Sequence, residues 1–412
     1  MRQRLRRWLG IDSAEHLAQR ALERTARAAD ATTAAADAAA RESERSRHLS
    51  ERIARDVRRL GRQIALLNGI VHQQADATAD ALQRAGWQSE AEALEQRLLR
   101  QVLEGIEGSG DIIAGPWTGE VGFELLYWIP FLNWLCQQGL DSRRLLVVSR
   151  GGAAPWYRHL TSRYVDVLDV MTPEQLRDRT TGSGDKRKQY DPKRALDQEI
   201  LAAIAATAGT TDATVLHPGT MFRLFGALWR KRATIGLVDS FTVFRALGEP
   251  TPPDPELALP ERYVAAKFYF SESFPATGAN EAFVTDILRR ASTHMPVVLL
   301  GTGAAIDDHS DFRSAVGPNV RVVDTSDVPQ TNLARQTAIV RGARGFIGTY
   351  GGFAYLAPLH GVRSVSFFSR RSFESHHLEL ASRVFDKLLP GGFVALDTRA
   401  IDSVEPAIDR WR

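Results

Sequence analysis

Two glycine-rich turns, about 230 residues apart, each follow a short apolar strand pattern and precede an apolar helix pattern. The first runs from Gly115 to Glu124, and the second runs from Phe346 to Phe353. Glycine allows a sharp backbone turn, and the N–H groups at the start of the following helix favour a phosphate or another anion. Two such turns in separate α/β halves predict an enzyme that holds a phosphorylated donor between two domains.

Strand patterns alternate with helix patterns after residue 110. Strands are expected at 111–114, 144–149, 164–170, 214–216, 263–270, 296–300, 320–323, 345–347 and 362–368. Helices are expected at 124–137, 280–293, 332–341 and 353–359, with a polar surface loop at 180–194. This alternation predicts parallel sheets with crossover helices. Because the proline-rich segment 249–255 divides the pattern, we expect an α/β fold of two Rossmann-like domains that bind ligands at the carboxyl ends of their strands.

The N-terminal region lacks the α/β pattern. Residues 13–106 contain no proline, which predicts a long helix or several joined helices. Apolar residues recur there at alternating steps of four and three: Ile53, Val57, Leu60, Ile64, Leu67 and Val71. This spacing predicts a coiled-coil stalk that forms a homo-oligomer, and the alternative is a helix folded back on its own catalytic domain. The expected domains are a helical stalk at 1–108, an N-terminal acceptor domain at 109–250 and a C-terminal donor domain at 251–412.

Composition narrows the function classes. The 412 residues include one cysteine, Cys136, which excludes disulfides and a cysteine-based metal site. The net charge of +3 gives no reason to expect a nucleic-acid partner. Since no apolar run is long enough to cross a bilayer, we expect a cytoplasmic protein. The basic segment 1–9, which contains Trp8, predicts peripheral contact with the anionic inner face of the membrane, with a frayed terminus as the alternative.

The second turn carries the candidate donor site. Gly351 and Gly352 would let the backbone approach a diphosphate, and the neighbouring Thr349-Tyr350 pair would place a hydroxyl donor beside it. The alternative is a glycine turn required only for packing. Lys267 lies in an otherwise apolar strand pattern, where an unpaired charge is unfavourable. It would face the diphosphate, or else reach solvent from the end of the strand.

The segment that contains the second turn resembles a known family. The stretch 333–368 looks like the donor-binding end of GT-B glycosyltransferases and is similar to the ADP-heptose lipopolysaccharide heptosyltransferases. In that family a turn and a helix N-terminus hold the donor diphosphate, with a basic residue near the position of Lys267. Thr349-Tyr350-Gly351 stands where Asp-Ser-Gly is usual.

The resemblance also gives the first turn a role. In the family an acidic residue follows this turn, and a proline comes six residues later; Glu124 and Pro130 have that spacing. The family's acid is the general base for the acceptor hydroxyl, so Glu124 is the positional match, and Glu120 in the same turn is its rival. The alternative is a glutamate that only stabilises the helix start.

Further candidates follow other strands. Asp307 and His309 come after a strand-end turn and would meet ribose hydroxyls or a base edge, unless they form an acidic surface turn. On the acceptor side, the candidates are Gly119, Gly122, Arg150 and His217. An arginine at this place would pair with an anionic acceptor or with the phosphates.

Missing motifs limit the chemistry. The α/β halves contain no D-x-D, P-loop or G-x-G-x-x-G motif and no Cys/His cluster, so we expect neither a metal nor a bound cofactor. The expected reaction is metal-independent transfer of a sugar from a nucleotide diphosphate sugar to an acceptor hydroxyl. The resemblance implies a bacterial surface glycan, polysaccharide or lipid-linked saccharide as acceptor. A nucleotide-sugar epimerase and a non-catalytic coiled-coil scaffold remain alternatives.

Overall fold

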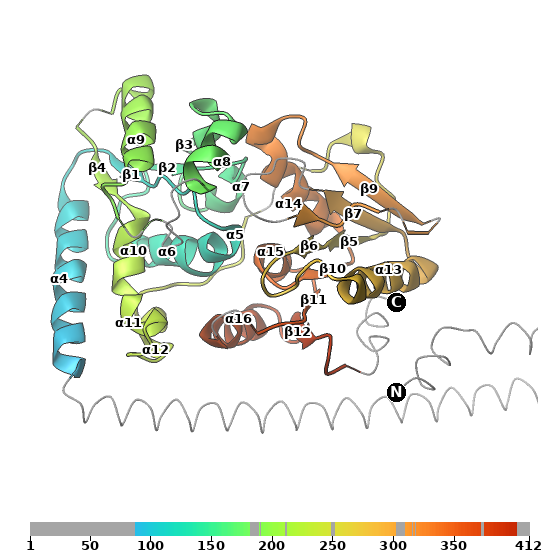
Figure 1. Ribbon diagram of the computed structural model, residues 1–412. Coiled ribbons are helices and arrows are strands. Elements are labelled where there is room, and N and C mark those ends of the chain that lie inside the picture. The colour runs from blue at the N-terminus through green and yellow to red at the C-terminus, as the bar shows by residue number, and fades with distance from the viewer. Residues whose placement is uncertain are drawn as a thin grey trace, which may run out of the picture. The chain divides into compact units, whose positions relative to one another are not determined.

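The computed structural model describes residues 87–181, 189, 191–210, 212–248, 252–301, 310–314, 316–317, 319–371 and 375–401 (Figure 1). All described helices and strands lie within one compact unit that runs from Leu82 to Arg399. The heptad positions 53–71 of the predicted stalk lie outside the described residues, as do Asp307, His309 and the basic segment 1–9. Within the described part of the chain, no helix combines the length and the apolar character needed to cross a membrane.

The first half contains a four-stranded parallel sheet in the order β3-β2-β1-β4. Its strands are β1 (Ile112–Ala114), β2 (Leu145–Ser149), β3 (Tyr164–Asp166) and β4 (Thr214–Leu216). Side chains alternate between the two faces of a strand. Ile113 and Val148 therefore pack in one apolar cluster, whereas Ile112 and Val147 pack in another on the opposite face.

Helices cover both faces of this sheet (Figure 1). After β1 come α5 (Val121–Phe123), the π-helical segment η1 (Glu124–Trp128) and α6 (Ile129–Gln137). The other helical elements of this half are α7 (Ala154–Tyr157), η2 (Val167–Asp169), α8 (Pro173–Thr181), α9 (Ala195–Ala208), α10 (Pro218–Leu224), α11 (Gly226–Trp229) and α12 (Gly236–Ser240).

The second half contains a six-stranded parallel sheet in the order β12-β11-β10-β5-β7-β9. Its strands are β5 (Val264–Lys267), β7 (Val297–Gly301), β9 (Val320–Asp324), β10 (Gly345–Thr349), β11 (Ser364–Phe368) and β12 (Phe393–Asp397). The helical elements are η3 (Pro255–Leu257), α13 (Gly278–His294), η4 (Pro329–Thr331), α14 (Asn332–Gly342), α15 (Gly352–Leu359) and α16 (Ser375–Leu388). Counted along the chain, this is the doubly wound order of a Rossmann sheet, reversing between β5 and β10.

The predicted α/β fold with two parallel, Rossmann-like sheets is confirmed. Two strand predictions are wrong in part. The predicted strand 164–170 ends at Asp166, because this side chain caps a 3-10 turn by accepting from Leu168 N. The predicted strand 263–270 is interrupted at Phe268, after which β6 (Tyr269–Phe270) pairs antiparallel with β8 (Ser310–Asp311).

The helix α4 (Trp87–Glu107) packs against the first half, next to β4 and α10 (Figure 1). Leu98, Val102 and Ile106 are buried, and Arg144 Nη1 donates to the Ile106 carbonyl at 2.8 Å. The last helical segment before the α/β pattern therefore contributes to the core of the α/β unit.

Candidate active site

Both glycine-rich turns lie at the points where strand order reverses. The first turn leaves the carboxyl end of β1, whose neighbour β4 ends just before His217. The second leaves β10, which lies beside β5, so that Gly348 pairs with Lys267. In open parallel sheets, ligands bind outside the carboxyl ends of strands at such reversal points. The sheet topology therefore places the predicted residues of each turn where a ligand is expected.

The two turns meet. A Cβ added to Gly352 would lie 2.7 Å from Val121 Cγ1 and 2.9 Å from Gly122 N. A Cβ added to Gly122 would lie 3.5 Å from Gly352 N. The starts of α5 and α15, from opposite halves of the unit, thus pack backbone against backbone.

Glu124 begins the π-helical segment directly behind this contact. The Ile129 N–H donates to the Glu124 carbonyl, five residues back, and Pro130 has no N–H to continue the α-helical pattern. Single π turns inside helices recur at functional sites. The Glu124 side chain is 1% exposed, and its Oε1 accepts from Ser149 Oγ at 2.5 Å and from the Tyr157 hydroxyl at 2.6 Å.

Burial sets the protonation of this carboxyl. It raises the pKa of Glu124 from 4.5 to about 7, although both hydroxyls and the Arg150 guanidinium lower the pKa and Asp166 raises it further. A carboxyl with such a pKa exchanges protons near neutral pH, as a general base must. Its rival Glu120 is half-buried at the N-cap of α5, and its side chain makes no capping hydrogen bond there.

Two acceptor-side candidates contact each other. Arg150 is 5% exposed, and its Nη2 donates to the Gly119 carbonyl at 2.6 Å. The following glycines, Gly151 and Gly152, donate their backbone N–H groups to the buried Asp166 carboxylate at 3.0 and 2.7 Å. The turn after β2 is thereby fixed close to Glu124.

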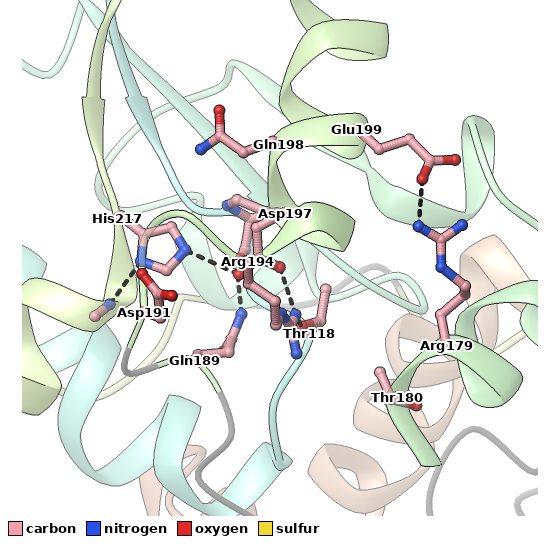
Figure 2. A network of polar contacts seen from close by, with 12 residues as sticks. Thr118, Arg179, Thr180, Gln189, Asp191, Arg194, Asp197, Gln198, Glu199 and His217 are labelled. Carbon is pink, nitrogen blue, oxygen red and sulfur yellow. Dashed lines mark hydrogen bonds and ion pairs between the residues drawn. The ribbon is translucent and has the colours of Figure 1, made fainter. Parts of the chain in front are cut away.

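His217 takes part in a network of polar contacts (Figure 2). Its Nδ1 accepts from Gly219 N at 2.9 Å, and its Nε2 lies 3.0 Å from the buried carboxylate of Asp197. Asp197 also accepts from Arg194, which donates to Thr118 Oγ1 at 2.6 Å. Both ring nitrogens of His217 therefore have partners, and Arg194 joins this network to the first turn at Thr118. Sequence patterns gave no signal for Arg194 or Asp197.

Lys267 is buried on the donor side. It is 3% exposed, so the alternative of a strand-end lysine that reaches solvent is wrong. Its Nζ lies 3.9 Å from Oδ1 of Asp311, whose side chain is 3% exposed, and 4.8 Å from the ring centroid of Phe353, in the first turn of α15. The charge thus lies beside the start of the helix that was predicted to bind phosphate. The sequence did not indicate Asp311 or Phe353 as partners.

The second turn is held from inside the protein. Thr349 Oγ1 donates to the Tyr269 carbonyl at 2.9 Å and accepts from Tyr269 N at 3.0 Å, so the hydroxyl expected to face a ligand is used internally. Gly351 has a φ of +149°, and a Cβ there would lie 1.9 Å from the Tyr269 hydroxyl. Tyr350 is 5% exposed, and its ring packs edge-on against Tyr355. The packing alternative therefore accounts for part of this glycine pattern.

Glycosyltransferases, the class that the second turn resembles, are also found among similar solved structures, at low sequence identity and low TM-score. The ADP-heptose lipopolysaccharide heptosyltransferase II of E. coli is 11% identical, over 72% of this chain and 92% of its own, with a TM-score of 0.38. A family 9 glycosyl transferase from Veillonella parvula is 11% identical over 72% and 87%, with a TM-score of 0.37. The glycosyltransferase SnogD from Streptomyces nogalater is 13% identical over 71% and 88%, with a TM-score of 0.35. No family model and no curated protein sequence matches the chain.

The two halves also contact each other at a half-buried histidine that the sequence did not indicate. His377 on α16 lies with its Nδ1 2.5 Å from the hydroxyl of Tyr127, which belongs to the same π-helical segment as Glu124. Burial lowers the pKa of His377 to about 3, so the ring is neutral at physiological pH. Among the described residues, no three His, Cys, Asp or Glu side chains are grouped so as to hold a metal ion.

These groups define the chemistry that the site can perform. Glu124 supplies a carboxyl that can take up a proton, and Lys267 supplies a buried positive charge beside the start of α15. The contact between Gly122 and Gly352 brings the segment that leads into Glu124 against the start of α15, where Lys267 lies over Phe353. A proton acceptor on one half and a cation on the other suit a reaction that deprotonates one substrate and releases an anion from another.

Proposed function

We propose that the protein is a GT-B-type glycosyltransferase that moves a sugar from a nucleotide diphosphate sugar to an acceptor hydroxyl without a metal ion. The observation that carries this proposal is the Glu124 carboxyl, with a pKa of about 7, directly behind the contact between the two glycine-rich turns. The resemblance of the second turn to the heptosyltransferases supports a hexose or heptose donor. It also supports an acceptor in a bacterial surface glycan, reached from the cytoplasm at the inner face of the membrane.

In the proposed reaction, Glu124 takes the proton of the acceptor hydroxyl while the acceptor oxygen bonds to the anomeric carbon. The bond from that carbon to the phosphate oxygen breaks, and the nucleoside diphosphate leaves with the electron pair. Lys267 and the dipole of α15 stabilise the negative charge of the leaving group. Arg150 stands on the acceptor side of Glu124, where it would orient an anionic acceptor or the phosphates.

Glu120 is the rival base because it is the more accessible of the two glutamates. Glu124 is 1% exposed. To act as the base, it would have to become accessible to the acceptor hydroxyl, so the residues that cover it must move when substrates bind. The variants Glu124→Gln and Glu120→Gln separate these roles. We expect E124Q to lower the transfer rate at least about a hundredfold with donor affinity nearly unchanged, as for loss of a general base. Wild-type turnover by E124Q together with an inactive E120Q would assign the base to Glu120.

The test of the proposed function is a donor-consumption assay. The full chain is incubated with sugar-linked UDP, GDP, ADP and dTDP, with and without a lipid-linked saccharide extract, and phosphorus NMR follows the released nucleoside diphosphate. We expect release from one donor class that depends on the extract and survives chelation of divalent metals. Conversion of the donor sugar or release of nucleotide without any acceptor would point to an epimerase. Absence of turnover with every donor and acceptor would favour a scaffold.

A further inference from the structure

Two hydroxyl groups from separate elements converge on one oxygen of Glu124. Ser149 ends β2, and Tyr157 ends the short helix α7. Ser149 Oγ lies 2.5 Å and the Tyr157 hydroxyl 2.6 Å from the same atom, Glu124 Oε1. Ser149 and Tyr157 are both 0% exposed. Bulk water therefore does not replace these contacts, and the two hydroxyls fix the plane of the carboxyl.

This geometry distinguishes the two carboxyl oxygens. An oxygen that accepts two hydrogen bonds is the better place for negative charge or for the C=O end of the protonated acid. A proton on Oε1 would displace at least one of the two donors, whereas a proton on Oε2 leaves both bonds in place. The protonated and ionised forms of Glu124 can then share one side-chain position.

We propose that Ser149 and Tyr157 are positioning residues that hold Oε1 of Glu124 and leave Oε2 as the oxygen that takes up the proton. This inference rests on the proposed function only in naming the acceptor hydroxyl as the source of that proton. Neither hydroxyl touches a reacting atom. Their effect on turnover acts through the orientation and the proton affinity of Glu124.

Other charged and titratable groups lie on the elements around the carboxyl. The neighbouring strands contribute Arg150, after β2, and Asp166, at the end of β3, which accepts from the Tyr164 hydroxyl at 2.8 Å. Of the other elements packed against η1, α15 carries Tyr355 and α10 carries Arg223. The variants must therefore remove a hydroxyl and leave all of these groups in place.

The test compares Tyr157→Phe and Ser149→Ala with matched controls. Tyr263→Phe removes a buried phenol hydroxyl that donates to Ile339 O, and Ser366→Ala removes a buried hydroxyl that donates to Val394 O, both in the second half. Carbon-13 NMR of protein labelled at the glutamate side-chain carboxyl follows the titration of Glu124, and the resonance missing in E124Q assigns it. Each lost donor weakens the ionised form, so we expect the midpoint to rise by about one pH unit or more in Y157F and in S149A. The controls should stay close to wild type.

The apparent pKa on the acidic side of the pH profile of kcat/KM for transfer should rise by the same number of pH units. Unchanged midpoints in both Y157F and S149A, or an equal rise in Y263F, would overturn the inference. If Y157F does not fold, S149A carries the test with Ser149→Thr, which keeps a hydroxyl, as the rescuing variant. A raised midpoint in a protein without transferase activity would sustain the positioning role and reject the proposed function. Transferase activity with unchanged midpoints in the variants would support the proposed function and reject the positioning role.

Discussion

At the residue scale, the candidate site contains an acid whose ionised form is unfavourable in the folded protein. Glu124 has almost no contact with solvent, and two hydroxyls together with the charge of Arg150 do not fully offset its burial. A buried carboxyl with a raised pKa lowers the stability of the folded protein whenever it is ionised. Such a group is typical of functional sites, where its proton affinity is matched to its task.

The pH dependence of stability tests this directly. The pKa of Glu124 is raised from 4.5 to about 7, so the destabilisation is absent below pH 4.5, grows between 4.5 and 7 and is complete above. Glu124→Gln can keep both hydrogen bonds at Oε1 and removes the charge. We expect E124Q to be more stable than wild type at pH 8, by up to about 3 kcal/mol, with the difference vanishing towards pH 4.5. Urea unfolding across this range measures it, and a difference that does not vary with pH would contradict it.

Lys267 gives a second prediction at this scale. Lys267→Ala removes the cation that lies over Phe353, at the start of α15. We expect the affinity for the cognate nucleoside diphosphate to fall about tenfold or more, which corresponds to about 1.4 kcal/mol. Isothermal titration calorimetry measures the affinity, with the exposed Lys387→Ala as a matched control. Equal affinities for wild type and K267A would place Lys267 outside the donor site.

At the element scale, the contact between α5 and α15 joins the two halves at the candidate site. Gly352 has no room for a side chain, because a Cβ would lie 2.7 Å from Val121 Cγ1. Gly352→Ala should therefore destabilise the protein by about 1–3 kcal/mol through overpacking and should lower activity. Gly278→Ala is the matched control, since nothing lies within 4 Å of a Cβ at that helical position. Thermal unfolding measures both, and a G352A protein as stable as G278A would contradict the tight contact.

Sequence patterns predicted the helices, strands and turns better than they predicted the contacts between side chains. Glycine spacing and alternating apolar runs predicted both turns and the strands around them, because these signals are local. The partners Ser149 and Tyr157 of Glu124, and Asp311 of Lys267, come together only through tertiary packing. No pattern marks them. Local capping by Asp166 also ended a strand whose apolar run continued, so a hydrophobic pattern alone misplaced that boundary.

At the scale of the whole molecule, the unit needs α4 as well as the two sheets. Deleting residues 1–86 keeps this helix, whereas deleting residues 1–107 removes the buried Leu98, Val102 and Ile106. We expect the longer deletion to lower the free energy of unfolding by about 4 kcal/mol or more and the shorter one to leave the fold intact.

The shorter deletion should also reduce the molar mass in solution to that of a monomer, as the predicted stalk requires. Light scattering after size exclusion checks this, and an unchanged oligomer would reject the coiled coil.

The central claim is that the two glycine-rich turns form one site for a nucleotide diphosphate sugar. The most direct measurement is a thermal-shift screen of the full chain against UDP, GDP, ADP, CMP and dTDP, with and without Mg²⁺, repeated with K267A. A ligand that binds only the folded protein raises its melting temperature. We expect stabilisation by one nucleoside diphosphate, equal with and without the metal and weaker in K267A. Stabilisation by none of them would contradict it.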